Sequence, residues 1–169
     1  KGSSVTLKIY AQEKLLIEDT VHSAAPWGIE LKGDVRQFTV RHNRFSDITR
    51  HAIGGNMHNA TTHGEIIFNY AKPGVALELN QDGMAGRIHV SRNTFIGRVN
   101  IRNTDTSDGP FVLTQNIILS PDSGAKGSRV SFEGVTDPSR VHMSDNLVGS
   151  LNERVLDETG KLTAAYAKY

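Results

Sequence analysis

The sequence contains no cysteine, and this absence excludes disulfide bonds and cysteine-based zinc sites. Aromatic residues are scarce, at 7%, and apolar residues together make up only 37%. No apolar run is long enough to cross a bilayer and no signal-peptide pattern is present, so we expect no membrane insertion. Basic and acidic residues nearly balance, 19 against 18, without a long run of either sign. This balance gives no support for nucleic acid or a membrane surface as a partner.

Glycine, by contrast, is frequent, with 16 residues in a chain of 169. The lean apolar content suits a thin fold whose core is one column of side chains, and the length suits one domain. We place a repeat domain at residues 1–150 and a capping segment or tail at 151–169. Because Val5 is already in the repeat described below, we expect a fragment or processed form of a larger parent chain.

Short segments of alternating apolar and polar residues recur along the chain. Alternation of this kind places the apolar side chains on one face of a β-strand. The apolar residues that open the first five segments are spaced by 24 residues, and a sixth segment starts at Val130. The five positions are Val5, Ile29, Ile53, Leu77 and Ile101.

A second pattern, apolar-x-apolar-x-x-Asn-x-apolar, follows within the same units. Its asparagines are Asn43, Asn93, Asn116 and Asn146, and degenerate copies occur at Asp19 and Asn69. The longest interval contains a Gly/Ser/Pro-rich stretch at 120–128, which predicts an inserted loop. An inward Asn at each turn would hydrogen-bond buried peptide groups of neighbouring coils.

Two folds have an Asn at a period near 24, the leucine-rich repeat and the right-handed parallel β-helix. The leucine-rich repeat also needs a Leu well before its strand, and the residues eight places before the Asn match this poorly: Val35, Ala85, Asp108 and Pro138. The rest of each unit is a second alternating strand. We therefore predict an all-β right-handed parallel β-helix of about six coils with an asparagine ladder. The alternative is a leucine-rich-repeat binding domain.

The end of the chain carries a helical pattern. Leu162, Ala165, Tyr166 and Tyr169 fall at i, i+3, i+4 and i+7, which is one face of a helix. We expect this short helix to close the last coil.

The units resemble those of the pectate-lyase-like superfamily of parallel β-helix proteins. The resemblance covers roughly residues 5 to 150 and is carried by Asn43-Arg-Phe45, Asn93-Thr-Phe95 and Asn116-Ile-Ile118. It implies the fold but not one activity, because the superfamily includes lyases, hydrolases, epimerases, phage tailspikes and inert adhesins. It also implies an exported protein, placed extracellularly, in the periplasm or on a virion surface. Homotrimers are common among spikes of this kind.

Outward side chains of one strand stack on those of the next coil, about 4.8 Å away. The first strand type therefore predicts one polar face, formed by Glu30, Lys32, Asn56, His58, Glu78, Asn80, Asp82 and Arg102. Such a face suits an extended glycan, above all an acidic polysaccharide. Trp27, the single Trp, is either a sugar-stacking platform or packed at a coil corner. Gly54 and Gly55 remove side chains from the face, which predicts a notch for a ligand or a close packing contact.

Three groups of residues could carry chemistry, two of them on this face. Arg102 with Glu78 and His58 could support β-elimination on a uronate, because a cation neutralises the carboxylate while a base removes the adjacent proton. The alternative is a surface ion pair between Arg102 and Glu78. Glu78, Asn80 and Asp82 offer oxygen ligands for Ca²⁺, or form a solvated strand edge.

The third group consists of His51, His58 and His63, which lie close together in the sequence. They would form either a metal site or, in better agreement with their spacing, a solvated turn. Taken together, the sequence favours part of a polysaccharide lyase or of a tailspike-like depolymerase. The alternative is a passive structural or adhesin shaft without catalysis.

Overall fold

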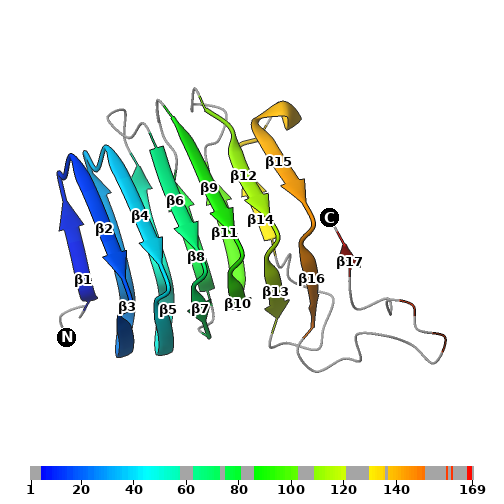
Figure 1. Ribbon diagram of the computed structural model, residues 1–169, viewed down its shortest axis with the longest axis horizontal. Helices are drawn as coiled ribbons and strands as arrows, with labels where there is room; N and C mark the ends of the chain where they lie inside the picture. Colours follow the sequence, from blue (N-terminus) through cyan, green and yellow to red (C-terminus); the bar gives the residue numbers. More distant parts are fainter. Residues whose placement is uncertain are drawn as a thin grey trace.

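Our structure of the protein is a computed structural model, and it describes residues 5–57, 63–72, 75–80, 86–102, 109–120, 130–135, 137–150, 159, 161 and 167–168. The chain winds into a parallel β-solenoid in which strands of successive coils lie side by side (Figure 1). The prediction of an all-β parallel β-helix is confirmed. The described residues include one short 3-10 helix, η2 (Pro138–Arg140), and no helix that could span a membrane.

Each coil contributes strands to three faces. The first face pairs β1 (Val5–Tyr10), the second half of β3 (Val21–Gly33), the second half of β5 (Arg44–Met57), β8 (Val75–Asn80), β11 (Arg98–Arg102) and β14 (Val130–Glu133). The second face is a six-stranded sheet with one strand from each successive coil: β2 (Lys14–Glu18), β4 (Gln37–Arg41), β6 (His63–Ile67), β9 (Arg87–Ser91), β12 (Phe111–Thr114) and β15 (Val141–Ser144).

The third face begins with the first halves of β3 and β5, which run through the corner into the first face. It continues with β7 (Tyr70–Ala71), β10 (Thr94–Ile96), β13 (Ile117–Ser120) and β16 (Leu147–Ser150). Parallel pairing from β5 through β7, β10 and β13 to β16 leaves the side chains of this face in rows along the solenoid.

Apolar side chains from the three faces form one hydrophobic cluster inside the coils. Its largest members are phenylalanines that are at most 2% exposed: Phe38, Phe45, Phe95 and Phe111. Two of these, Phe45 and Phe95, come from the Asn-x-Phe pattern. The alternation of the first face also holds, because Ile29, Ile53, Leu77 and Ile101 are buried as predicted.

The asparagine ladder is present and continuous through the described coils. Asn43, Asn69, Asn93, Asn116 and Asn146 are each at most 2% exposed. In the first four of these, the backbone N–H and the side-chain amide both donate to the side-chain oxygen of the next Asn, as between Asn93 and Asn116, at 3.0 Å for both bonds. Amides also donate to backbone carbonyls, as from Asn93 to Ile66. The ladder therefore satisfies buried polar groups at the turn between the second and third faces.

The residue before each ladder position has a left-handed backbone, with φ between 54° and 58°. These residues are Asp19, His42, Phe68, Arg92, Gln115 and Asp145. A non-glycine residue in this region is costly, and the ladder hydrogen bonds of the following residue hold it there. Side chains at these positions stack outside the coils, where the rings of His42 and Phe68 are 5.3 Å apart.

The ladder position of the first coil is Thr20, which corrects the assignment to Asp19. The backbone N–H of Thr20 donates to the side-chain oxygen of Asn43 at 3.1 Å, and its hydroxyl donates to the same oxygen at 2.6 Å. Asp19 is exposed and has the left-handed backbone that precedes each ladder residue. Asp19 matched the sequence pattern because an Asp side chain resembles that of Asn, but the hydroxyl of Thr20 is the group that reaches Asn43.

The register between coils differs from the expected 24-residue spacing at two places. Leu7, and not Val5, is level with Ile29. Leu77 is level with Val99, and Ile101 is level with Leu79. A β-bulge causes part of this shift, since Arg98 pairs with Val75 and Val99 with Leu77, which leaves Ala76 as an extra residue. Both shifts are by two residues, so the buried face is unchanged.

The prediction of a terminal helix is wrong for the part of this segment that the structure describes. Ala167–Lys168 form strand β17, which pairs antiparallel with β16 at the end of the third face. Leu162, Ala165, Tyr166 and Tyr169 lie outside the described residues. A strand at this place satisfies the exposed edge of β16 with backbone hydrogen bonds, which a helix would not do.

Candidate functional site

A pocket of about 240 Å³ opens on the first face, across the strands β3, β5, β8 and β11. Seven residues predicted from the sequence line it: Trp27, Glu30, Lys32, Asn56, Glu78, Asn80 and Arg102. Gly54 and Gly55 also line it, so the notch expected from these glycines is present. His51 completes the lining.

The parallel register brings these residues together. Glu30, Gly54 and Glu78 are level on three neighbouring strands. The next row lies two residues further along the strands and consists of Lys32, Asn56 and Asn80. Arg102 of β11 extends this row. Because Gly54 has no side chain, the row between Glu30 and Glu78 is open in its middle.

A short contact in the pocket joins neighbouring coils. Nε2 of His51 lies 2.9 Å from a carboxylate oxygen of Glu78. Both side chains are mostly covered, with 17% and 24% of their surface exposed. The remaining solvent access of the pair faces the pocket that both residues line.

Trp27 supports the ring of His51 from the preceding coil. The two rings meet edge to face, with centroids 4.5 Å apart and planes at 64°. The Trp27 ring also contacts the guanidinium of Arg50, which lies 5.5 Å from the ring centre. Trp27 is thus packed at the corner of the coil and also forms part of the pocket wall.

Ion pairs hold the charged side chains of the pocket. Lys32 lies 3.0 Å from Glu30, which also contacts Lys8 at 3.3 Å. Arg102 lies 3.8 Å from Glu78 and 3.0 Å from Glu133 on the following coil. The surface pairing of Arg102 with Glu78 that we expected is present, but it is longer than the contact of Arg102 with Glu133.

Burial keeps the pocket histidine neutral near pH 7. Burial lowers the pKa of His51 below 6.5, although the neighbouring Glu78 carboxylate acts in the opposite direction. Arg50 and Arg102 contribute smaller effects, and both also lower the pKa of His51. The pocket therefore holds a neutral imidazole between carboxylates and guanidinium groups.

Three of the histidine and carboxylate residues named from the sequence are not seen at the pocket, two of them because the structure does not describe them. His58 and Asp82 lie outside the described residues. His63 starts β6 on the second face, where it contacts Glu65 at 3.5 Å, whereas His51 lies on the first face. His51 and His63 are therefore not in one cluster. Within the described ranges, no three His, Asp or Glu side chains gather as a metal site.

His51 was not assigned to the polar face from the sequence, and the corner of the coil explains why. Counting by two from the buried Ile53 places His51 inside, but Ala52 and Ile53 are both fully buried. Alternation is therefore broken between them, as it is between Gly28 and Ile29 on β3. One sequence feature could have identified His51: it stands 24 residues after Trp27, at the same place in the next unit.

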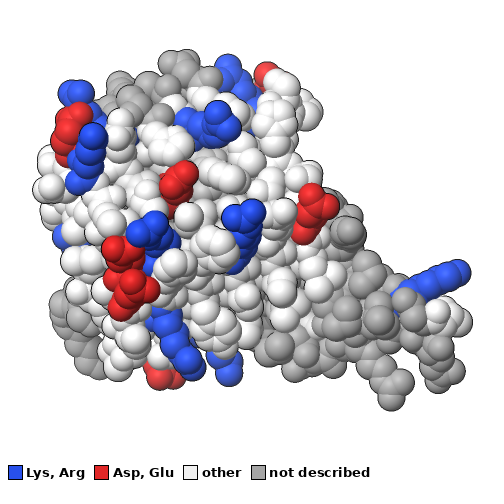
Figure 2. Space-filling view, in the orientation of Figure 1, with Lys and Arg blue, Asp and Glu red and all other residues white. Residues whose placement is uncertain are grey.

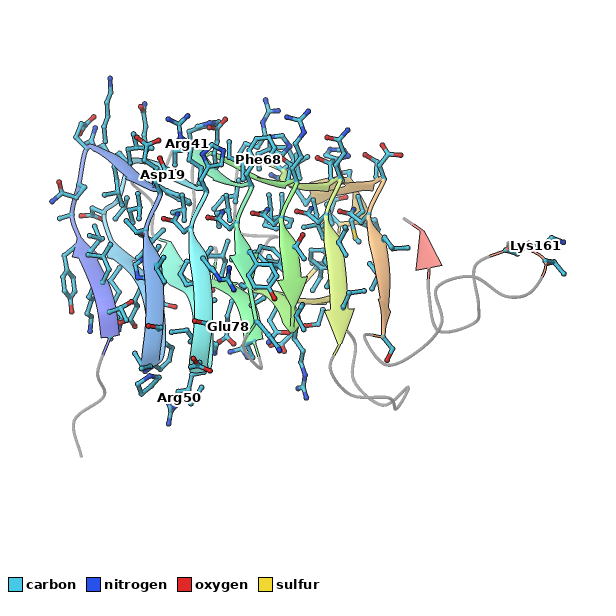
Figure 3. All side chains as sticks on the ribbon, turned by 60° about the horizontal axis from the view of Figure 1, so that its bottom comes forward. Asp19, Arg41, Arg50, Phe68, Glu78 and Lys161 are labelled. Atoms are coloured by element: carbon cyan, nitrogen blue, oxygen red, sulfur yellow. The ribbon has the colours of Figure 1, made fainter. Side chains whose placement is uncertain are left out.

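Charges of both signs are mixed on the face of the solenoid that Figure 2 shows. Acidic and basic side chains are interspersed there, without a large patch of one sign among the described residues. Figure 3 places Arg50 and Glu78 toward the opposite side of the coils from Asp19, Arg41 and Phe68. The pocket and the outer stack of left-handed residues are thus separate surfaces.

Comparisons with protein-family models, with curated proteins and with solved structures find no match to this chain.

Proposed function

We propose that the pocket of the first face binds a glycan and that the chain is part of a polysaccharide lyase or a tailspike-like depolymerase. The observation that supports this most is the composition of the pocket wall. It combines an aromatic ring, Trp27, with two cations, two carboxylates and two amides within one cavity of about 240 Å³. Sugars need this combination, because their hydroxyls donate and accept hydrogen bonds while their ring faces are apolar.

An acidic polysaccharide is the favoured ligand. Lys32 and Arg102 line the pocket with 36% and 43% of their side-chain surface exposed, so their remaining donors can reach a uronate carboxylate. Glu78 and Asn80, together with Asp82, would supply oxygen ligands if Ca²⁺ assists binding. The resemblance to the pectate-lyase-like superfamily, which includes lyases and phage tailspikes among other activities, is compatible with this proposal and with an exported location.

A passive shaft is the second candidate, and a separate observation favours it. Ion pairs and ladder bonds connect consecutive coils away from the pocket, as between Glu18 and Arg41 and between Glu13 and Arg36. Repeated links of this kind stiffen a solenoid whether or not it binds a ligand.

The test is a depolymerisation and binding screen. The protein would be incubated with acidic and neutral polysaccharides, with Ca²⁺ and with a chelator. Unsaturated uronate would be followed by ultraviolet absorbance, reducing ends by a colour assay, and binding by glycan pull-down. We expect binding of an acidic polysaccharide that weakens at least tenfold in Arg102→Ala and Trp27→Ala.

Arg92→Ala is the matched control, because Arg92 is exposed on the outer stack and contacts Gln115 at 3.0 Å. It should bind like the unmodified protein. Absence of binding across the panel, or equal binding by Arg102→Ala and Arg92→Ala, would favour the shaft.

A further inference from the structure

We infer that His51 is the proton-accepting residue of the pocket and that Glu78 is the positioning residue that holds its ring. The inference rests on the proposed function, since the proton would come from a glycan bound in this pocket. It assigns a role to a residue that the sequence pattern did not place on this face. Four features of the structure support it.

The hydrogen-bond partner fixes the tautomer. A carboxylate only accepts hydrogen bonds, so the Nε2 atom that lies 2.9 Å from Glu78 must carry the hydrogen. In the neutral ring the lone pair is then on Nδ1. A carboxylate that accepts from one ring nitrogen makes the other a better base and fixes its direction.

Nδ1 of His51 borders the space that Gly54 leaves open. Nδ1 makes no hydrogen bond with any residue in the described ranges. A methyl group built on Gly54 would lie 3.8 Å from Nδ1. Its nearest atoms would be the backbone oxygen of Glu78 and Cβ of His51, both at 3.6 Å. Glycine at this position therefore gives a small group of a ligand access to Nδ1.

The ring is held on a second side by Trp27, with the edge-to-face contact at 4.5 Å. A base that is held by both a hydrogen bond and a ring contact loses little freedom when the ligand binds. Trp27 and Gly54 both line the pocket, so a sugar that stacks on the indole would lie next to Nδ1.

The charges that surround the ring are mixed. Glu78 on β8 is the nearest acidic group, Arg50 precedes His51 on β5, and Arg102 approaches from β11. Glu30 and Lys32 of β3 line the same pocket. Burial lowers the pKa of His51, so the ring is unprotonated and ready to accept a proton at neutral pH.

The step is a simple proton transfer. The proton leaves an O–H or an acidic C–H group of the bound sugar and is taken up by the lone pair of Nδ1. The electron pair of the broken bond stays on the sugar. The resulting imidazolium keeps its Nε2–H directed at the Glu78 carboxylate, which stabilises the positive charge.

The first experiment needs no substrate. Diethyl pyrocarbonate acylates unprotonated, accessible imidazole nitrogens, and peptide mass spectrometry would follow the modification of His51 in the whole protein. We expect fast modification that slows at least tenfold in Gly54→Ala, where the added methyl covers Nδ1. Gly55→Ala, also on the pocket wall, is the matched control and should react at the original rate. Slow modification of His51 in the unmodified protein, or equal rates in Gly54→Ala and Gly55→Ala, would overturn the inference.

The fluorescence of Trp27 provides the readout for Glu78. Trp27 is the single Trp, and protonation of a ring in contact with it should change its emission. A pH titration should show one transition that is lost in His51→Gln. Because Glu78 raises the pKa of His51, the transition should move to lower pH in Glu78→Gln. An unchanged midpoint in Glu78→Gln would show that Glu78 does not position the ring.

The last arm separates this inference from the proposed function. On a polysaccharide that the screen shows to be bound and cleaved, His51→Gln should lower kcat at least a hundredfold and leave glycan binding within threefold. Binding without any cleavage, or full activity of His51→Gln, would overturn the role of His51 while leaving glycan binding intact. Loss of glycan binding as a whole would instead remove the proposed function, and the acylation rates would still decide whether Nδ1 is an accessible base.

Discussion

The side-chain amide of Asn69 donates a hydrogen bond to the side-chain oxygen of Asn93, which lies 3.0 Å away on the next coil. The same Asn93 oxygen accepts the backbone N–H of Asn69 at 2.8 Å. Each coil therefore supplies the acceptor that its predecessor needs, and the interior of the turn is polar but fully bonded. This arrangement explains how a chain with few apolar residues sustains a long buried column.

Asn93→Ala should be strongly destabilising, because it removes the centre of this arrangement. The substitution removes the acceptor of the buried backbone N–H of Asn69 and one of the three acceptors of its side-chain amide. It also removes the amide that donates to the carbonyl of Ile66. Unsatisfied buried groups cost about 1–3 kcal/mol each, so we expect a loss of roughly 3 kcal/mol or more in the free energy of unfolding. Urea unfolding followed by circular dichroism would measure it.

Asn56→Ala is the matched control for the ladder, since Asn56 is exposed at the pocket. It should change the free energy of unfolding by less than about 0.5 kcal/mol. Equal urea midpoints for Asn56→Ala and Asn93→Ala would contradict a structural role of the ladder.

Two glycines of β3 and β5 should differ sharply in their tolerance of alanine. A methyl group on Gly28 would lie 2.3 Å from the backbone carbonyl oxygen of Ala52, so the corner of the coil would have to move. Overpacking of this kind costs about 1–3 kcal/mol. Gly54→Ala has room for the methyl group and should be neutral or slightly stabilising, by less than about 1 kcal/mol. Thermal unfolding of both variants tests this. If Gly28→Ala were as stable as Gly54→Ala, the corner would not be tightly packed.

The stability of the fold should decrease as the pH falls below about 6.5. Burial lowers the pKa of His22, His51 and His89 from 6.5. Between the lowered native values and 6.5, the unfolded chain binds more protons than the native chain, so acid favours unfolding. Each histidine adds a slope of at most about 1.4 kcal/mol per pH unit. Above pH 7.5 or so, the contribution should be complete and flat.

His22 offers a way to separate this effect from general acid unfolding. It is 6% exposed and stacks on Phe45 with ring centroids 4.9 Å apart. In His22→Gln the slope of the unfolding free energy between pH 7 and 5 should decrease. His142→Gln, which replaces an exposed histidine of β15, should leave the slope unchanged. A wild-type slope in His22→Gln would mean that this residue does not take part.

The sequence determined the coil interior better than the pocket. The period, the inward faces and the Asn-x-Phe turns were predictable, because each depends on a local pattern that repeats, as at Asn43 and Asn93. Register was not predictable at Ala76, because a shift by two residues buries the same face. His51 was missed because the coil corner interrupts alternation at Ala52 and Ile53. Pocket residues that follow a regular strand, such as Glu78 and Asn80, were predicted correctly to lie on one face.

Thr20 should be the weak point at the start of the ladder, because it bonds in place of an asparagine. Its hydroxyl donates to Asn43 at 2.6 Å and contacts Nε2 of His22 at 2.8 Å. Thr20→Val keeps the shape but removes both contacts, and it should lower the free energy of unfolding by about 1–3 kcal/mol in urea titrations. Thr20→Ser retains the hydroxyl and should recover most of this loss. Thr39→Val is the control, since Thr39 makes only a 3.4 Å contact with Glu65 on the second face. If Thr39→Val cost as much as Thr20→Val, the hydroxyl of Thr20 would have no special role, and the ladder would begin at Asn43.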